Sequence, residues 1–412
     1  MNTVDMSPLN PAELKIDLTL KGVRLDPGAH IHTKLVPYSG RAEGTQNVEL
    51  VLADDVCVTV AVDESQIGES PYVLSGYDAA CSLRRNGTSV AVRLVGPPAF
   101  YGETTSAGRP MWRVGTVYGG SIAINAAAAC SVSLAGAPCR FCRSGSGSAI
   151  GDSFPMSVSE VVEVVRAAFA EGAVEFVYFN PPYTGNEDAG IAFLEPYIRA
   201  VKKHFNTLVA VQTHPPTTNR WIDRTYAMGV DALSYPIEIH NSDVLARRCP
   251  GRVRRIGIQR YYDALTYAAS VFPSGTVWSE LVVGIEPPES TVSGIDMLVS
   301  MGVLPVLSVL RSSDDTAIGD WPREPEGFRT VFAHLFNAVR RSPINMGWIR
   351  DLSFAVTPFE ARFFADEDTR GVVALPHFYR SRLGSLTTRG LSRLRRRLRV
   401  RTISDSFDAS RL

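Results

Sequence analysis

From residue 119 to residue 365, strand-like and helix-like segments alternate, and this alternation limits the fold more than any other feature of the sequence. Short apolar runs typical of buried strands are followed by longer segments with apolar residues at helical spacing. The strand-like runs cover 121–129, 174–179, 208–212, 232–239, 277–284, 303–310 and 352–356, and the main helical ones cover 191–204, 219–228, 260–271, 291–301 and 327–341. Repeated strand–helix units predict an α/β fold with a parallel sheet, and about six or seven of them fit a complete or partly open, TIM-like (β/α) barrel.

The regions on either side of this pattern have a different character, so the sequence predicts three parts. Residues 1–118 are rich in Val, Leu and Thr and are predicted to form a β-rich domain, with a strand over Lys15–Val23. Asn86-Gly87 predicts a hairpin turn between two of its strands. Residues 119–365 are the predicted barrel, and 366–412 form an Arg-rich tail.

The tail contains the run Leu391–Arg401, in which basic residues surround leucines at helical spacing. Leu391, Leu394 and Leu398 share one face of the predicted helix. We expect this helix to dock on its own domain; binding to an acidic partner or a lipid surface is the alternative.

Three of the six cysteines lie close together, and their spacing is typical of a metal site. Cys130, Cys139 and Cys142 follow the first strand of the predicted barrel, whereas Cys57, Cys81 and Cys249 stand apart in the sequence. Soft thiolates suit zinc or an iron–sulfur cluster. Zinc usually needs four protein ligands in a structural site, and no fourth ligand follows at finger spacing. A [4Fe–4S] cluster held by three cysteines leaves one iron open; the alternative is that the three are buried small side chains.

Composition excludes several classes of protein. Lys plus Arg and Asp plus Glu both number 42, so the net charge is zero and a general nucleic-acid binder is not expected. Six cysteines are too few for a disulfide scaffold in a chain of 412 residues. No run reaches the ~18 apolar residues of a membrane span, and the N-terminus lacks the pattern of a secretion signal. We therefore expect a cytoplasmic protein without a transmembrane segment.

The cysteine loop, with Phe141 directly before the last cysteine, resembles that of the radical S-adenosylmethionine (SAM) enzymes. The spacing Cys-x8-Cys-x2-Cys is a minority variant in that superfamily, and the chain looks closest to the biotin-synthase-like branch. The resemblance implies one [4Fe–4S] cluster on Cys130, Cys139 and Cys142. It also implies reductive cleavage of SAM to a 5′-deoxyadenosyl radical, with electrons from a donor such as flavodoxin or ferredoxin.

The resemblance further implies positions for SAM. Beside Phe141, these are the backbone near Asn180 and Pro181, where the family has a Gly-Gly-Glu-like turn, together with Glu238, Gly284 and Glu286. Arg260 is expected to bind the SAM carboxylate, with Arg255 and Arg248 as alternatives, because guanidinium groups bind carboxylates bidentately.

Polar side chains at the ends of the predicted strands are the candidates for the substrate pocket, because chemistry in such barrels lies at the carboxyl ends of the strands. They are Tyr183, Gln212, His214, His240, Glu280, Ser308 and Arg311. The function we expect is hydrogen abstraction from a small biosynthetic substrate. A peptide-modifying enzyme that uses the N-terminal β-region for recognition, a zinc-binding barrel without redox chemistry, and a scaffold on a decayed enzyme fold are the alternatives.

Overall fold

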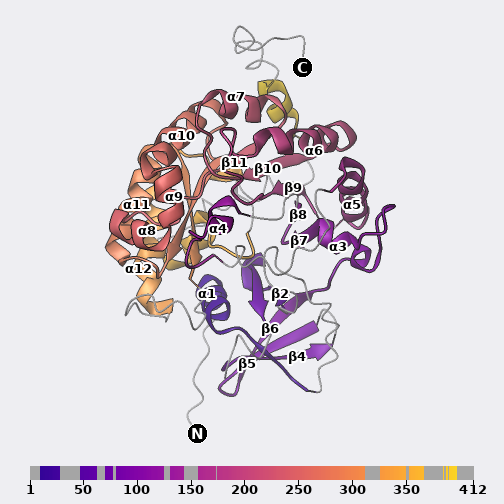
Figure 1. Cartoon of the computed structure of the whole chain (residues 1–412). Coiled ribbons are helices and arrows are strands. Elements are labelled where there is room, and N and C mark those ends of the chain that lie inside the picture. Colours follow the sequence, from indigo (N-terminus) through magenta and orange to yellow (C-terminus); the bar gives the residue numbers. More distant parts are fainter. Residues whose placement is uncertain are drawn as a thin grey trace.

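A seven-stranded sheet forms the centre of the computed structural model (Figure 1). The structure describes residues 10–27, 47–62, 70–77, 80–124, 130–142, 156–172, 174–310, 325–348, 352–365, 384, 387 and 389–396. The strand order is β13-β12-β11-β10-β9-β8-β7, with every neighbouring pair parallel except β7 and β8. The strands are β7 (Gly115–Tyr118), β8 (Ser121–Ile124), β9 (Phe176–Phe179), β10 (Leu208–Gln212), β11 (Ala232–Ser234), β12 (Val277–Val283) and β13 (Leu304–Val309).

Helices cover the outer face of this sheet, where they bury its apolar side chains (Figure 1). Val177, Val211 and Leu281 are among the strand residues that pack against the helices. Ser157 and Glu160 have the Ser-x-x-Glu spacing that is typical of a capping box, and they form one at the start of the first long helix. The helices are α5 (Val158–Ala170), α6 (Ile191–His204), α7 (Arg220–Ala227), α8 (Ser242–Arg248), α9 (Pro250–Arg255), α10 (Ile258–Val271), α11 (Pro288–Ser300) and α12 (Pro325–Arg340).

The inner face of the sheet carries a separate and smaller apolar cluster. Phe176, Tyr178 and Ala210 belong to it, with Trp278 packed against its side. Alternate residues of a strand point to opposite faces, so these side chains lie opposite the helices. Over β8, β9 and β10 the inner face therefore carries side chains that are separate from the main core.

The sheet is open among the described residues, with β7 and β13 as its two edges. Of the two predicted forms, a complete or a partly open barrel, the described residues show the open one. The predicted strand over 352–356 is wrong, since only a single antiparallel bridge joins Val356 to Leu307. The predicted first strand ends as β8 at Ile124, and 125–129 lie outside the described residues. β7 joins this sheet ahead of the boundary expected after residue 118, because it forms a hairpin with β8.

The N-terminal region contains the predicted β-structure in a second sheet, ordered β1-β4-β5-β6-β2-β3. The hairpin at Asn86-Gly87 is present, and both residues have positive φ, as a type I′ turn requires. The strands are β1 (Arg24–Leu25), β2 (Asn47–Val51), β3 (Cys57–Ala61), β4 (Val73–Tyr77), β5 (Ala80–Arg85) and β6 (Thr88–Val95).

The strand predicted over Lys15–Val23 is wrong: this segment belongs to the helix α1 (Pro11–Lys21), capped by the side chain of Asn10. The alternating pattern has a different cause. Ala12 and Ile16 pack into the core of the seven-stranded sheet, while Leu14 and Leu18 pack into the core of the N-terminal sheet. Two apolar stripes with i, i+4 spacing, offset by two residues, produce an alternation in sequence that resembles a strand.

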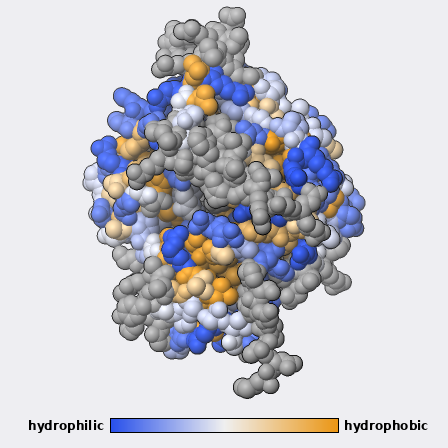
Figure 2. Space-filling model, turned by 180° about the vertical axis from the view of Figure 1, so that it is seen from behind, coloured by the Kyte–Doolittle hydropathy of each residue, from blue (hydrophilic) through white to orange (hydrophobic). Residues whose placement is uncertain are grey.

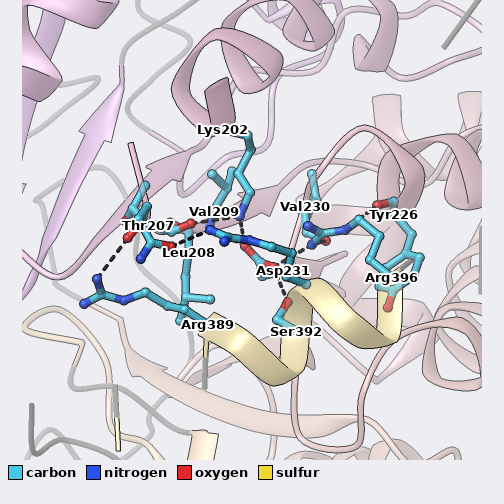
Figure 3. A network of polar contacts seen from close by, with 12 residues as sticks. Lys202, Thr207, Leu208, Val209, Tyr226, Val230, Asp231, Arg389, Ser392 and Arg396 are labelled. Atoms are coloured by element: carbon cyan, nitrogen blue, oxygen red, sulfur yellow. Dashed lines mark hydrogen bonds and ion pairs between the residues drawn. The ribbon is translucent and has the colours of Figure 1, made fainter. Parts of the chain in front are cut away.

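The described part of the tail is a helix over 389–396 that docks on the chain's own seven-stranded domain. Ser392 and Arg396 bind Asp231, which is buried directly before β11 (Figure 3). Leu391 and Leu394 point outward instead and are 49% and 56% exposed. Figure 2 shows this apolar surface at the top of the view, where Figure 1 places the helix. The third leucine of the predicted face, Leu398, lies outside the described residues.

No helix in the described part of the chain is both long enough and apolar enough to cross a membrane.

Candidate functional site

The cysteine loop is attached to the end of the neighbouring strand. Cys130 stands at the N-cap of the short helix α4 (Ser131–Leu134). The backbone N–H of Ser131 donates to Tyr183 O at 2.7 Å, and its hydroxyl donates to Thr184 O at 2.5 Å. Both acceptors lie in the segment after β9. The loop therefore sits at the carboxyl ends of the parallel strands, where the chemistry of such sheets is found.

The three sulfur atoms are not gathered around one point in this conformation. No group of three or more His, Cys, Asp or Glu side chains among the described residues could hold a metal ion. Cys139 is half-buried beside Cys249, whereas Cys142 is exposed. A hydrogen bond with the thiol of Cys249, and then burial, raise the pKa of Cys139 above its usual value; Arg252 opposes this rise.

An ion pair lies beside this loop, formed by Arg252 of α9 and Glu238 from the segment after β11. Arg252 is buried, and its guanidinium also donates to Pro236 O at 2.9 Å and to Ile237 O at 3.2 Å. Glu238 has a φ of 62°, which is unusual for a residue other than glycine. Backbone conformations of this kind are concentrated at functional sites.

A chain of aromatic and imidazole groups extends the pair towards the end of β10. Arg252 Nε donates to Tyr261 Oη at 3.1 Å, and Tyr261 Oη lies 2.5 Å from Nδ1 of His214. The rings of His214 and Tyr183 meet edge to face with their centroids 5.0 Å apart. Burial lowers the pKa of His214 to about 3, with a smaller contribution from Arg252, so the imidazole is neutral at physiological pH. The tertiary structure thus connects two predicted residues, His214 and Tyr183, to Glu238.

Other predicted positions occupy separate places. Arg260 Nε donates to Pro216 O at 2.6 Å, and an NH2 group donates to Asn219 Oδ1 at 2.9 Å, so this guanidinium is held by the loop after β10. Glu286 is buried and accepts from the backbone N–H groups of His240 and Asn241. Burial raises the pKa of Glu286, and these hydrogen bonds oppose the rise.

The imidazole of His240 contacts Tyr262 Oη at 3.0 Å, and burial lowers its pKa. Gly284 has a φ of 91° and packs near Phe328. Phe141 packs beside Cys139 against a small apolar cluster. Asn180 is exposed and Pro181 is buried in the turn after β9, while Arg311 lies outside the described residues.

Three predicted residues share the inner face of the sheet. Strand register places Gln212, Glu280 and Ser308 on the same face as the small apolar cluster. Tyr178 donates to Gln212 Oε1 at 2.8 Å, and Ser308 donates to Glu280. The hydroxyl of Ser234, between Gln212 and Trp278 in register, is buried and has no partner among the described residues.

Three functional candidates were missed by the reasoning from sequence: Arg252, Tyr261 and Cys249. Arg252 is one of five arginines between residues 247 and 255, and nothing in their spacing distinguishes it. What selects it is the close packing of α9 on the cysteine loop. A Cβ atom on Gly251 would lie 2.4 Å from Ala137 O, so only glycine allows this approach.

Comparison with known proteins assigns the domain that carries these features. Residues 129–297 match the Radical SAM superfamily. The chain contains a radical SAM domain. The cofactors of that superfamily are a [4Fe–4S] cluster and SAM.

Two further comparisons add less. Among solved structures, the chain is similar to Streptococcus suis SuiB bound to S-adenosylmethionine, at 13% identity and a TM-score of 0.37. The similarity covers 58% of this chain and 53% of that one, so the match spans about half of the solved protein. No curated protein matches the chain.

The radical SAM domain provides suitable donors for the cluster, but it does not gather them in the conformation described. Three thiols on one loop at the carboxyl edge of the sheet have the soft donor chemistry that iron–sulfur clusters require. The side chain of Cys139 is directed to Cys249 instead of to a common centre with Cys130 and Cys142. Cluster binding by this loop therefore requires Cys139 to leave its present partner.

Proposed function

We propose that the chain is a radical SAM enzyme that abstracts hydrogen from a small, polar biosynthetic substrate held on the inner face of the sheet. The observation that supports this most is the position of the cysteine loop. The loop lies at the carboxyl ends of the parallel strands, next to the Arg252–Glu238 pair and inside the matched region. The thiols that could hold a cluster thus lie on a segment adjacent to the Arg252–Glu238 pair, whose charged groups could bind the amino acid part of SAM.

Cys130, Cys139 and Cys142 are the residues that would hold the cluster, with Phe141 beside them. When bound, a cluster of this kind supplies the electron that splits SAM into methionine and a 5′-deoxyadenosyl radical. We expect flavodoxin or ferredoxin to be the electron donor and the cytoplasm to be the location.

For SAM, the contacts favour Glu238 as acceptor for an ammonium or ribose hydroxyl group. Arg260 remains our proposal for the carboxylate because it borders the loop after β10, although two of its donors are already used within the chain. Arg252 is an alternative cation next to Glu238. The backbone at Asn180 and Pro181, Gly284 and Glu286 complete the proposed SAM-binding positions.

The substrate would lie along Gln212, Ser234, Glu280 and Ser308. These groups offer hydrogen-bond partners beside the aromatic rings of Tyr178 and Trp278. A few polar groups among apolar and aromatic ones are typical of small-molecule sites. Tyr183, His214, His240 and Arg311 are the other proposed substrate contacts.

The deciding experiment is an anoxic incubation of iron- and sulfide-loaded, reduced protein with SAM, followed by chromatography for 5′-deoxyadenosine. We expect a brown protein that forms this product and a Cys130→Ala variant that has neither colour nor product. A Cys57→Ser variant is the matched control, since Cys57 lies in the N-terminal sheet, and it should behave like the wild type.

A colourless protein that binds stoichiometric zinc would contradict the proposal and favour the non-redox barrel. Cleavage of SAM that persists in the Cys130→Ala variant would contradict the cysteine assignment while leaving the activity in place.

A further inference from the structure

Cys249, isolated in the sequence, is a direct neighbour of Cys139 in the fold. It lies at the junction of α8 and α9 and is fully buried. Its thiol forms a hydrogen bond with the thiol of Cys139. Both side chains belong to one apolar cluster, which also includes Val244 and Leu245 of α8.

The backbone holds the two cysteines in this position. The N–H of Arg140 donates to Arg248 O at 2.9 Å, so the residues next to Cys139 and Cys249 are hydrogen-bonded to each other. The contact of Gly251 with Ala137 O fixes the same two segments at a second point. Thiols in contact on segments tied this closely need little movement to meet the geometric limits of a disulfide.

We propose that Cys139 and Cys249 form a disulfide bond in the cluster-free protein when a low-molecular-weight disulfide such as oxidised glutathione is present. Cys139 reacts first because it is the more exposed thiol. The raised pKa of Cys139 keeps its thiolate scarce, so the exchange is slow. The thiolate that does form attacks the glutathione disulfide and releases one glutathione, and Cys249 then displaces the second. Two protein thiols and one oxidised glutathione thus give one protein disulfide and two reduced glutathiones, the two protein-thiol protons passing to the glutathione thiolates.

The consequence rests on the proposed function, in which Cys139 is a cluster ligand. A sulfur bound in a disulfide cannot ligate iron, since the ligand is the thiolate. The oxidised protein therefore cannot take up a cluster, and a reductant restores this capacity. The buried pair acts as a reversible block on cluster loading that senses the thiol redox state.

The test uses full-length, metal-free protein prepared without oxygen and then treated with oxidised glutathione. After alkylation of free thiols and proteolysis, mass spectrometry should find peptides linked through Cys139 and Cys249. The Cys249→Ser variant should lose this link and keep glutathione attached to Cys139. The Cys57→Ser variant is the control and should form the link as the wild type does.

A link between Cys139 and Cys142, or a Cys249 that remains free for alkylation after denaturation, would overturn the proposal; neither readout depends on the folding of a variant. Iron uptake is measured on the same samples before and after reduction, and we expect it only after reduction. A linked protein that takes up no iron even when reduced would contradict the cluster assignment but not the disulfide. If the reduced protein cleaves SAM but the oxidised protein shows no Cys139–Cys249 link, the disulfide is contradicted and the proposed function is not.

Discussion

Glu280 shows how one residue on the inner face depends on its surroundings. Burial raises the pKa of its carboxyl from 4.5 to about 7, Ser308 opposes the rise by hydrogen bonding, and Glu238 adds to it. The folded state therefore holds a proton on this carboxyl at pH values where the unfolded chain has released it. A group of this kind makes the folded state less stable as the pH rises through that window.

We predict that the wild type loses free energy of unfolding between about pH 5 and about pH 8, and that Glu280→Gln removes part of this loss, about 1–3 kcal/mol after allowing for partial exposure. Urea denaturation at both pH values measures it. A slope remains in the variant, because burial also raises the pKa of Glu49 to about 7. Equal slopes in wild type and variant would show that Glu280 is not enclosed as described.

At the scale of elements, the C-terminal helix binds through its polar side and exposes its leucines. The carboxylate of Asp231 accepts a hydrogen bond from Lys202 at 2.9 Å. It also accepts hydrogen bonds from Arg396 and Ser392 at 2.5 Å each (Figure 3). Burial by itself would raise the pKa of Asp231, but Arg396, Lys202 and the Ser392 hydroxyl hold it below its usual value. This contribution to stability is present above the ordinary carboxyl pKa and is lost as the pH falls through the lowered one.

We predict that Arg396→Ala costs about 1.5–3 kcal/mol of unfolding free energy at neutral pH, since it removes charge-assisted hydrogen bonds to Asp231 and to Val230 O. Arg393→Ala is the matched control: its contact with Asn206 is exposed, and we expect a change within about 0.5 kcal/mol. Denaturation at neutral and acidic pH measures both, and the cost of Arg396→Ala should shrink in acid. Equal costs for the two variants would exclude docking through Asp231.

At the scale of the whole molecule, α1 joins the two sheets. Lys15 forms a buried ion pair at 2.6 Å with Glu360 of α13 (Pro358–Ala361) and donates to Leu352 O at 2.7 Å. In the second connection, the N–H of Gly119, in the β7–β8 turn, donates to Glu49 of β2. The N-terminal region is therefore joined to the domain of the seven-stranded sheet through buried polar groups as well as apolar ones.

We predict that Lys15→Met and Glu360→Gln each destabilise the protein by about 3–5 kcal/mol, because each leaves a buried partner uncompensated. The double variant should cost clearly less than the sum of the two. Urea denaturation of the four proteins gives this coupling energy. Additive effects would mean that the two side chains do not interact in solution.

Interactions between residues close together in the sequence determined many of the structural features described above. The strand–helix alternation, the Ser157 capping box and the Asn86-Gly87 turn act over a few residues, so the sequence alone predicts them. The cysteine spacing predicts a metal site, and the resemblance of the cysteine loop to a known superfamily implied the radical SAM domain. Gln212, Glu280 and Ser308 were also predictable, because residues at corresponding places on parallel strands share a face.

Where several residues or segments look alike in the sequence, only the tertiary structure decided which of them has which structural or functional role. The alternation in α1 arises from two cores on opposite sides of a helix, and Arg252 differs from the neighbouring arginines because Gly251 lets α9 approach the cysteine loop. Cys249 meets Cys139 for the same reason, although the two cysteines are 110 positions apart in the sequence. Such contacts depend on how segments far apart in the sequence pack together, and the residue pattern of one segment does not indicate which other segment will pack against it.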